Sequence, residues 1–139
     1  MPHTIERNDL VHKSYLFEVR RLRLGMHDGR KIDRDLIHHN GAALILPVLD
    51  DGSIVMIRNY RYAARGYLWE VPCGTLEDGE APEVCAAREL TEESGYIANR
   101  LDKLGQFYSS PGYNNEIIHA YLATDLTRGE QKLEGYEDI

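Results

Sequence analysis

The alternation of apolar and polar residues predicts that the chain begins with a β-hairpin. Apolar residues alternate with polar ones over residues 15–24, and a second strand is predicted at 31–39, after a turn at Asp28-Gly29. The alternation changes parity at Arg20-Arg21, which indicates a bulge. Because the hairpin has few apolar side chains to contribute to a core, we expect it either to project from the main domain or to pair with a partner.

The next hundred residues predict further strands around one helix. Gly41–Leu49 is a continuous apolar run, typical of a strand buried on both faces. A turn at Asp51-Gly52 leads into a strand at 53–61. Three more strands are expected at 68–71, 101–109 and 116–123. We therefore expect an α+β fold with a mixed β-sheet.

The one clear helix is expected between Pro82 and Gly95. Proline suits the first turn of a helix because its missing N–H would be unpaired there. Glycine adopts the left-handed conformation that ends many helices. The face that would pack on the sheet consists of small and apolar residues, namely Val84, Ala87, Leu90, Thr91 and Ser94.

The opposite face of this helix carries three acidic residues. Glu89, Glu92 and Glu93 stand at i, i+3 and i+4, so a helix places their carboxylates together. Like charges at this spacing destabilise a helix. A hard divalent cation, which binds oxygen ligands, is the natural source of compensation. The alternative is a Glu-rich helix that only presents a solvated surface.

The spacing of the residues around these acids favours a functional site. The segment 74–96 resembles the Nudix box, in which a glycine is followed by a glutamate and then by the pattern Arg-Glu-apolar-x-Glu-Glu-x-Gly. The matching residues are Gly74, Glu80, Arg88, Glu89, Leu90, Glu92, Glu93 and Gly95. This resemblance implies a Nudix-like mixed β-sheet sandwiched by helices, with a second helix following later in the chain.

Two other segments resemble a subgroup of the Nudix family, the ADP-ribose pyrophosphatases. Asn59–Tyr62 followed by Trp69–Gly74 is similar to the subgroup's QYR…ELPAG pattern, with Asn59 and Cys73 as departures. Ser110–Glu116 is similar to its SPG…E segment. Hydrolases of GDP-mannose share the SPG…E segment, so this match does not select one nucleotide sugar.

The resemblance implies a role for each candidate residue. The metal ligands would be Glu89, Glu92, Glu93 and the backbone carbonyl of Cys73, and the ion would be Mg²⁺, with Mn²⁺ as an alternative. Arg88 would orient Glu89 or the preceding loop through a salt bridge rather than contact the substrate. A general base often lies in a late acidic loop, and Glu134 and Glu137 occupy that region here.

Three residues are candidates for substrate binding, and each has a simpler alternative. Arg61 would bind a phosphate, or else form a surface ion pair. Trp69 would stack on the base, or else belong to the core, as aromatic residues in strands usually do. Glu116 would bind the terminal ribose by resemblance, or else be a surface acid at the end of a strand.

Composition bounds the class of protein. A chain of 139 residues with 42% hydrophobic residues is long enough for one globular domain. Its net charge of −7 argues against nonspecific binding to nucleic acid, which requires basic surfaces. No apolar run approaches the roughly 18 residues of a membrane span. Two cysteines, Cys73 and Cys85, make neither a disulfide framework nor a zinc site, which favours a cytoplasmic protein.

Together these features predict a metal-dependent hydrolase of a nucleoside-diphosphate sugar. ADP-ribose is the first candidate substrate, with AMP and ribose 5-phosphate as products. GDP-mannose or another such sugar is the alternative substrate, and a Nudix-fold sensor that binds without turnover is the alternative class. We expect residues 1–40 to form an extension that contacts a second subunit of a homodimer, and 41–139 to form the Nudix domain. The resemblance also implies a further strand and a long helix after Ile139, so either the chain is truncated or it covers that face of the sheet differently.

Overall fold

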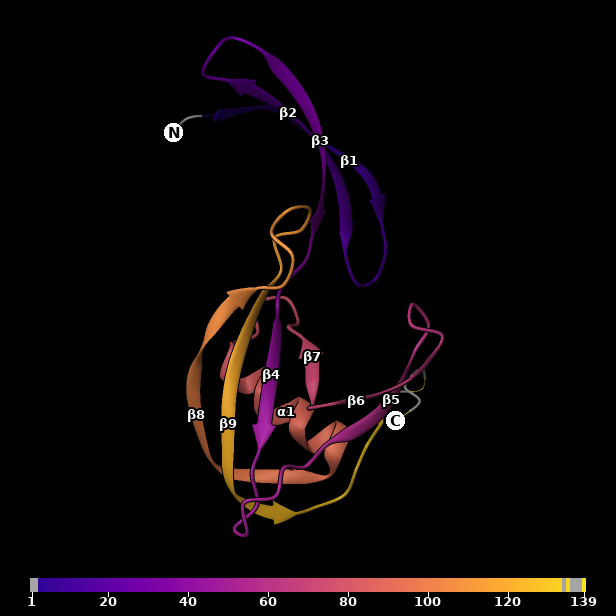
Figure 1. Cartoon of the computed structure of the whole chain (residues 1–139), viewed down its shortest axis with the longest axis vertical. Helices are drawn as coiled ribbons and strands as arrows, with labels where there is room; N and C mark the ends of the chain where they lie inside the picture. Colours follow the sequence, from indigo (N-terminus) through magenta and orange to yellow (C-terminus); the bar gives the residue numbers. More distant parts are fainter. Residues whose placement is uncertain (1–2, 134, 136–138) are drawn as a thin grey trace. The chain divides into compact units, whose positions relative to one another are not determined.

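The computed structural model describes residues 3–133, 135 and 139. These residues gather into two compact units (Figure 1). The N-terminal unit contains the chain up to Gly41 together with Tyr108–Ile117, and the larger unit contains Ala42–Phe107 and the chain from Ile118 onward. In chain order the elements are β1 (His3–Lys13), β2 (Glu18–Met26), β3 (Lys31–His38), β4 (Ala42–Pro47), β5 (Ile57–Arg61), β6 (Gly66–Glu70), β7 (Cys73–Thr75), α1 (Pro82–Ser94), β8 (Tyr96–Tyr108) and β9 (Ile117–Arg128). None of the helices in these ranges is both long and apolar enough to span a membrane.

The N-terminal unit is a three-stranded antiparallel sheet in the order β1-β2-β3. Strands β2 and β3 are the predicted hairpin, whereas β1 was not predicted, because its eleven residues are mostly polar and lack a clear alternation. The bulge expected at Arg20-Arg21 was wrong. Pairing of β2 with β3 is regular there, and the register shifts lie in β1, around Glu6 and Val11. The change of parity in β2 reflects apolar residues on both of its faces.

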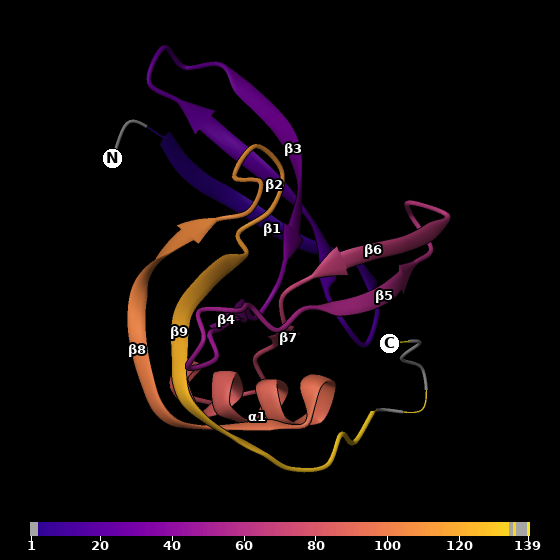
Figure 2. The ribbon, with the colours of Figure 1, turned by 60° about the horizontal axis from the view of Figure 1, so that its bottom comes forward.

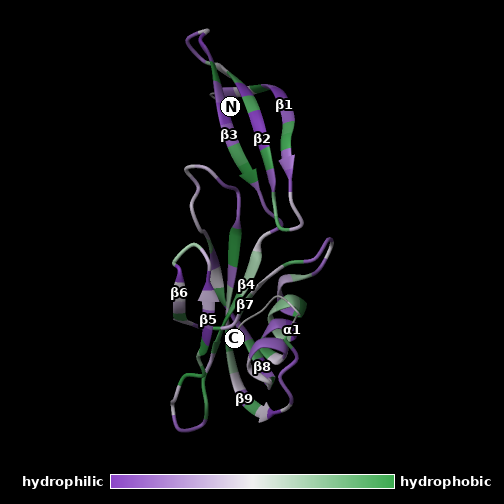
Figure 3. Ribbon diagram, turned by 90° about the vertical axis from the view of Figure 1, so that its right-hand side faces the viewer, coloured by the Kyte–Doolittle hydropathy of each residue, from purple (hydrophilic) through white to green (hydrophobic). Residues whose placement is uncertain are grey.

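Hydrophilic and hydrophobic residues are interspersed along the strands of this sheet (Figure 3), and the strand register assigns them to its two faces. One face carries exposed ion pairs across the strands, Arg21 with Asp35 and Arg23 with Asp33, each at 2.8 Å. Exposed pairs of this kind contribute little to stability. The strand register places six aliphatic side chains and Met26 on the other face, called the apolar face below, and none of the seven is buried in the described chain: Ile5, Leu10, Leu22, Leu24, Ile32, Leu36 and Met26. Arg20 and Arg34 lie on this face as well.

The larger unit is built on a four-stranded mixed sheet in the order β7-β4-β9-β8. Strand β4 lies inside this sheet, antiparallel to β7 and parallel to β9, and Ala42, Ala43, Ile45 and Pro47 are buried. The apolar run in the sequence therefore forms a buried strand, as predicted. Pairing with β4 fixes the positions of β7 and β9 in the sheet, and the chain continues from β7 into the helix.

Helix α1 packs against β4 and β7 (Figure 2). Pro82 is at its start, and Gly95 ends it with a φ of 75° while its N–H donates to the carbonyl of Thr91. Both end signals were predicted correctly. The packed face was not, because Val84 is 56% exposed and Ala87 is also exposed. The buried residues are instead Cys85, Ala86, Glu89, Leu90 and Glu93.

Two of the three acids therefore lie on the packed face of the helix rather than opposite to it. Residues 85, 89 and 93 follow one another at intervals of four, so their side chains form one row along α1. The row begins with Cys85, which belongs to the apolar core, and ends with two carboxylates. The sheet under this row consequently determines the surroundings of Glu89 and Glu93.

Strands β5 and β6 form a separate two-stranded hairpin. The predicted strand over residues 53–61 is shorter in the structure, where only Ile57–Arg61 forms β5. Ile54 makes an isolated bridge to Val48, after the turn at Asp51-Gly52. Strand β5 turns away from β4 after this bridge and pairs with β6.

His119 in β9 makes the stability of the fold depend on pH. Its Nδ1 is buried and has no hydrogen-bond partner among the described residues. Burial lowers the pKa of His119, and the nearby charge of Lys103 lowers it further, although Glu83 acts in the opposite direction. The folded state therefore binds a proton at this imidazole less readily than the unfolded state, which takes it up near the ordinary pKa of about 6.5.

We expect the melting temperature to fall as the pH is lowered through about 6.5, because the unfolded state takes up the proton first. In His119→Gln the fall between about pH 7 and about pH 5 should be smaller. Thermal unfolding of both proteins over this range measures the difference, with His12→Gln in the exposed β1 as the control. An unchanged pH dependence in His119→Gln would contradict the assignment.

Candidate active site

Strand β7 brings the loop before α1 against the acids of the helix. Its pairing with β4 joins Gly74 to Ala43 and Cys73 to Leu44. A Cβ atom added at Gly74 would overlap the carboxylate of Glu89. Only glycine leaves room for this carboxylate against the strand, which explains why the motif needs a residue without a side chain at this position.

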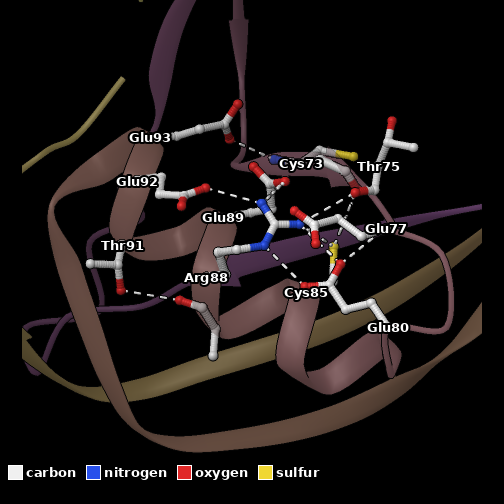
Figure 4. Close-up of polar contacts among 12 residues, drawn as sticks. Cys73, Thr75, Glu77, Glu80, Cys85, Arg88, Glu89, Thr91, Glu92 and Glu93 are labelled. Carbon is white, nitrogen blue, oxygen red and sulfur yellow. Dashed lines mark hydrogen bonds and ion pairs between the residues drawn. The ribbon is translucent and has the colours of Figure 1, made fainter. Parts of the chain in front are cut away.

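Arg88 lies at the centre of the acidic cluster (Figure 4). Its Nε and Nη2 each donate to the carboxylate of Glu80 at 3.0 Å, and its Nη1 donates to Glu89 Oε1 at 2.6 Å and to Glu92 Oε2 at 3.0 Å. The salt bridge predicted between Arg88 and Glu89 is therefore present. Hydrogen bonding to Arg88 holds the pKa of Glu80 below its usual range. One cation thus offsets part of the repulsion among three acids.

The backbone of β7 holds Glu93. Glu93 is only 3% exposed, and its Oε2 accepts a hydrogen bond from the N–H of Cys73 at 2.8 Å. A charge-assisted bond of this kind stabilises a carboxylate away from water. Glu93 on the helix and Cys73 on β7 are therefore fixed beside each other.

The chain after β9 caps the end of α1. The side-chain Nε2 of Gln131 donates to the backbone carbonyl of Glu93 at 2.6 Å. The backbone N–H of Lys132 donates to the carbonyl of Glu92 at 2.9 Å. Carbonyls in the last turn of a helix have no partner within the helix, so these bonds fix the turn that carries both acids. The sequence offered no signal for this contact.

The donor chemistry of this cluster fits a hard divalent cation. Glu89 and Glu93 are two buried carboxylates one helical turn apart, beside the backbone of Cys73-Gly74. No three His, Cys, Asp or Glu side chains within the described ranges are gathered as ligands of one ion. Arg88 instead draws Glu89 and Glu92 toward itself, so an ion would compete with the guanidinium for these two carboxylates.

The thiol of Cys85 contacts the acidic network, since its Sγ accepts a hydrogen bond from Arg88 Nη2 at 3.6 Å. Cys73 and Cys85 are not joined by a disulfide. Burial raises the pKa of Cys85 to about 12, so this thiol stays protonated and unreactive near neutral pH. Its Sγ lies 3.6 Å from the carbonyl oxygen of Gly74, which makes it part of the packing under the loop.

Arg61 and Trp69 lie on opposite faces of the β5–β6 hairpin. In antiparallel strands, residues paired directly share a face and the faces alternate along each strand. Trp69 pairs with Arg58 and is 68% exposed, on the face that also carries Tyr60 and Tyr67. Arg61 lies on the other face, where it forms an ion pair with Glu70 at 2.6 Å. The two residues therefore cannot bind adjacent parts of one ligand on a single face of this hairpin.

Glu116 belongs to the N-terminal unit. Its carboxylate accepts a hydrogen bond from the hydroxyl of Ser109 and lies 3.5 Å from His39 Nδ1. The N–H of Glu116 donates to the side-chain oxygen of Asn114 at 3.0 Å. The carboxylate of Glu116 thus lies between Ser109 of its own loop and His39 of the segment after β3. Its role in ribose binding stays a prediction, and the general-base candidates Glu134 and Glu137 lie outside the described residues.

Comparison with known proteins agrees with the motif. The NUDIX domain model matches residues 38–138. The chain is 43% identical to an ADP-ribose pyrophosphatase of Bacillus subtilis over 111 residues, which are 80% of this chain and 60% of that protein. It is 36% identical to a GDP-mannose pyrophosphatase of Cronobacter sakazakii over 111 residues, which cover 70% of this chain and 58% of that protein.

The fold has a solved counterpart as well. The crystal structure of an ADP compounds hydrolase superposes with a TM-score of 0.85 at 30% identity, covering 100% of this chain and 75% of that one. The chain spans about 60% of the length of the curated relatives that it matches. With the domain match extending over most of its residues, and with every fixed position of the box in place, the chain belongs to the Nudix family.

Proposed function

We propose that this protein hydrolyses the pyrophosphate bond of a nucleoside-diphosphate sugar, with ADP-ribose as the preferred substrate. The observation that carries the proposal is the pair of buried carboxylates, Glu89 and Glu93, fixed against Cys73-Gly74 at the end of β7. Burial of two acids side by side destabilises a fold unless a cation compensates their charge, so a protein retains such a pair where it serves a function. The similarity to ADP-ribose and GDP-mannose pyrophosphatases supports this class of substrate.

Mg²⁺ is the proposed cofactor, with Mn²⁺ as an alternative. Glu89, Glu92, Glu93 and the carbonyl of Cys73 would hold it, since all of their donor atoms are oxygens. When bound, such an ion neutralises phosphate charge and polarises a phosphoryl oxygen. The chain's own part is to orient the carboxylates: Arg88 holds Glu89 and Glu92, and the N–H of Cys73 holds Glu93.

The reaction adds one water across the pyrophosphate. The water oxygen attacks one phosphorus, the bridging P–O bond breaks, and ADP-ribose yields AMP and ribose 5-phosphate. We assign phosphate binding to Arg61, base stacking to Trp69 and ribose binding to Glu116. Since Trp69 and Arg61 are on opposite faces of their hairpin, we expect Trp69 to contact a base only if the base lies at the face that carries Tyr60 and Tyr67.

We propose a cytoplasmic location for the protein. The thiols of Cys73 and Cys85 support it, because the cytoplasm keeps thiols reduced.

Incubation with Mg²⁺ and ADP-ribose in ¹⁸O-labelled water tests the function. Hydrolysis places the label in one phosphate product, which mass spectrometry detects. A sensor that binds ADP-ribose without turnover would leave it intact. Cleavage of GDP-mannose with ADP-ribose left intact would move the assignment to the second substrate, which the relative from Cronobacter sakazakii supports.

We also propose that the protein is a homodimer in which the apolar face of the β1-β2-β3 sheet contacts the second copy. This face carries six exposed or half-exposed aliphatic side chains, and removing them from water at an interface would stabilise the dimer. The charged face of the same sheet, with its Arg–Asp pairs, would remain in solvent.

Leu24→Asp is therefore expected to convert a dimer into a monomer, because Leu24 lies between Ile5 and Ile32 on the apolar face. Sedimentation velocity at micromolar concentration measures the change. Arg23→Ala, on the charged face of the same strand, is the matched control and should remain dimeric. A wild-type protein that sediments as a monomer would refute the assembly.

A further inference from the structure

The face of the β5–β6 hairpin that carries Arg61 also carries Glu70. The strand register pairs Arg61 with Gly66 and Glu70 with Ile57, at opposite ends of the hairpin. The directly paired Asn59 and Leu68 lie between them on this face. Glu70 Oε1 accepts from Arg61 Nε at 2.8 Å, and Glu70 Oε2 accepts from Nη2 at 2.6 Å. This bidentate geometry fixes the plane of the guanidinium as well as its position.

The bidentate bond leaves one end of Arg61 able to act on a second group. A guanidinium has five N–H donors, and Glu70 uses the Nε–H and one N–H of Nη2. The remaining donors, on Nη1 and on the outer side of Nη2, point away from the Glu70 carboxylate because the group is planar. Arg61 can therefore keep its bond to Glu70 while it donates to a phosphate oxygen.

The chain brings the Arg61–Glu70 pair near the box, because Glu70 ends β6 only three residues before Cys73 begins β7. Hydrogen bonding to Glu70 is the largest cause that raises the pKa of Arg61, and the charge of Glu93 and the nearby Cys73 raise it further. The side chain of Glu70 is 20% exposed and that of Arg61 is 48% exposed. The carboxylate thus forms the more buried anchor, and the cation is the more accessible member of the pair.

We propose that Glu70 is a positioning residue that holds Arg61 in place to bind the pyrophosphate of a substrate seated at the box carboxylates. This inference rests on the function proposed above. Without Glu70, a long arginine side chain populates many rotamers, and a bound phosphate must select one of them. With Glu70, most of this ordering occurs when the protein folds.

A double-mutant cycle tests the proposal. The variants are Glu70→Ala, Arg61→Ala and the combination, each measured for KM and kcat with ADP-ribose and for the Kd of its nonhydrolysable α,β-methylene analogue. In Glu70→Ala we expect KM and Kd to rise roughly fivefold to tenfold, the cost of ordering one long side chain. In the Arg61→Ala background, the same substitution should leave both values unchanged, since the residue that Glu70 positions is gone. Glu70→Gln, which keeps one hydrogen bond, should fall between.

The matched control is Asp102→Asn on β8, which removes the acid from another exposed arginine pair of the same unit, Arg100 with Asp102 at 2.7 Å. It should change neither KM nor Kd. Unaltered KM and Kd in Glu70→Ala would overturn the positioning role, as would an equal loss in the Arg61→Ala background, which indicates a structural effect instead. A wild-type protein that binds the analogue without hydrolysing ADP-ribose would refute the proposed reaction while the Kd values still decide the role of Glu70. A wild-type protein that does neither would overturn both.

Discussion

Glu93→Gln is expected to lower turnover of the preferred nucleotide sugar by about 10²- to 10³-fold, the usual cost of removing one group from an electrostatically driven site. In the wild type the N–H of Cys73 donates to Glu93 Oε2 at 2.8 Å, and the side-chain oxygen of glutamine can still accept this hydrogen bond. The fold should therefore survive. Because Glu93 is only 3% exposed, removal of its charge should leave the melting temperature unchanged or raise it.

Steady-state kinetics and thermal unfolding, carried out side by side, separate these two effects. Glu130→Gln, an exposed glutamate of the C-terminal segment, is the control for the chemical change and should retain full turnover. Titration of the protein with Mn²⁺, followed by electron paramagnetic resonance, should show weaker ion binding in Glu93→Gln. Near-normal turnover in this variant would remove Glu93 from the proposed ligands.

Gly74→Ala is the second substitution from which we expect a large effect. The new methyl group would occupy the position of the Glu89 carboxylate, so either the carboxylate or β7 must move. The backbone at Gly74 is held by its pairing with Ala43, and β4 lies inside the sheet. We therefore expect the Glu89 side chain to be displaced, with a loss of turnover of about 10²-fold or more and a loss of stability of about 1–3 kcal/mol.

Gly135→Ala is the matched control, since a Cβ at Gly135 would meet no atom of the described residues within 4 Å. Glu89→Gln supplies the comparison for chemistry without overlap, and it should lose activity to a similar extent while keeping its stability. Chemical denaturation and kinetics of the three variants measure both quantities. A Gly74→Ala protein that retains wild-type turnover would show that the position of the Glu89 carboxylate is not critical.

The arrangement of the acids explains why the site is coupled to the core. Glu89 and Glu93 continue the row that Cys85 begins, so the residues that pack the helix and the two acids that we propose as metal ligands share one face. Arg88 and the N–H of Cys73 offset the charge from two sides. A substitution in the core under α1 should consequently disturb the reaction, even when it touches no acid.

Local signals in the sequence were sufficient wherever the structure is itself local. Pro82 and Gly95 mark the ends of α1 because the conformations of proline and glycine are set by their own covalent geometry. The spacing of Glu89, Glu92 and Glu93 places three acids on one helix by the pitch alone. The buried strand β4 followed from a run of apolar residues that could not remain in water.

Features that depend on partners distant in sequence had to come from the tertiary structure. Strand β1 exists because β2 offers it a paired edge, and its own polar sequence carries no such signal. The side of α1 that packs is decided by β4 and β7, which is why Glu89 and Glu93 are buried while Val84 is exposed. The register of β5 with β6 places Arg61 beside Glu70 and on the face opposite Trp69. The sequence alone determined the family and the acids of the candidate site, because fixed spacings encode both. Strand pairing determined which acids are buried and which side chains hold Arg61 and Arg88. Side chains far apart in the chain meet only after the sheet has formed.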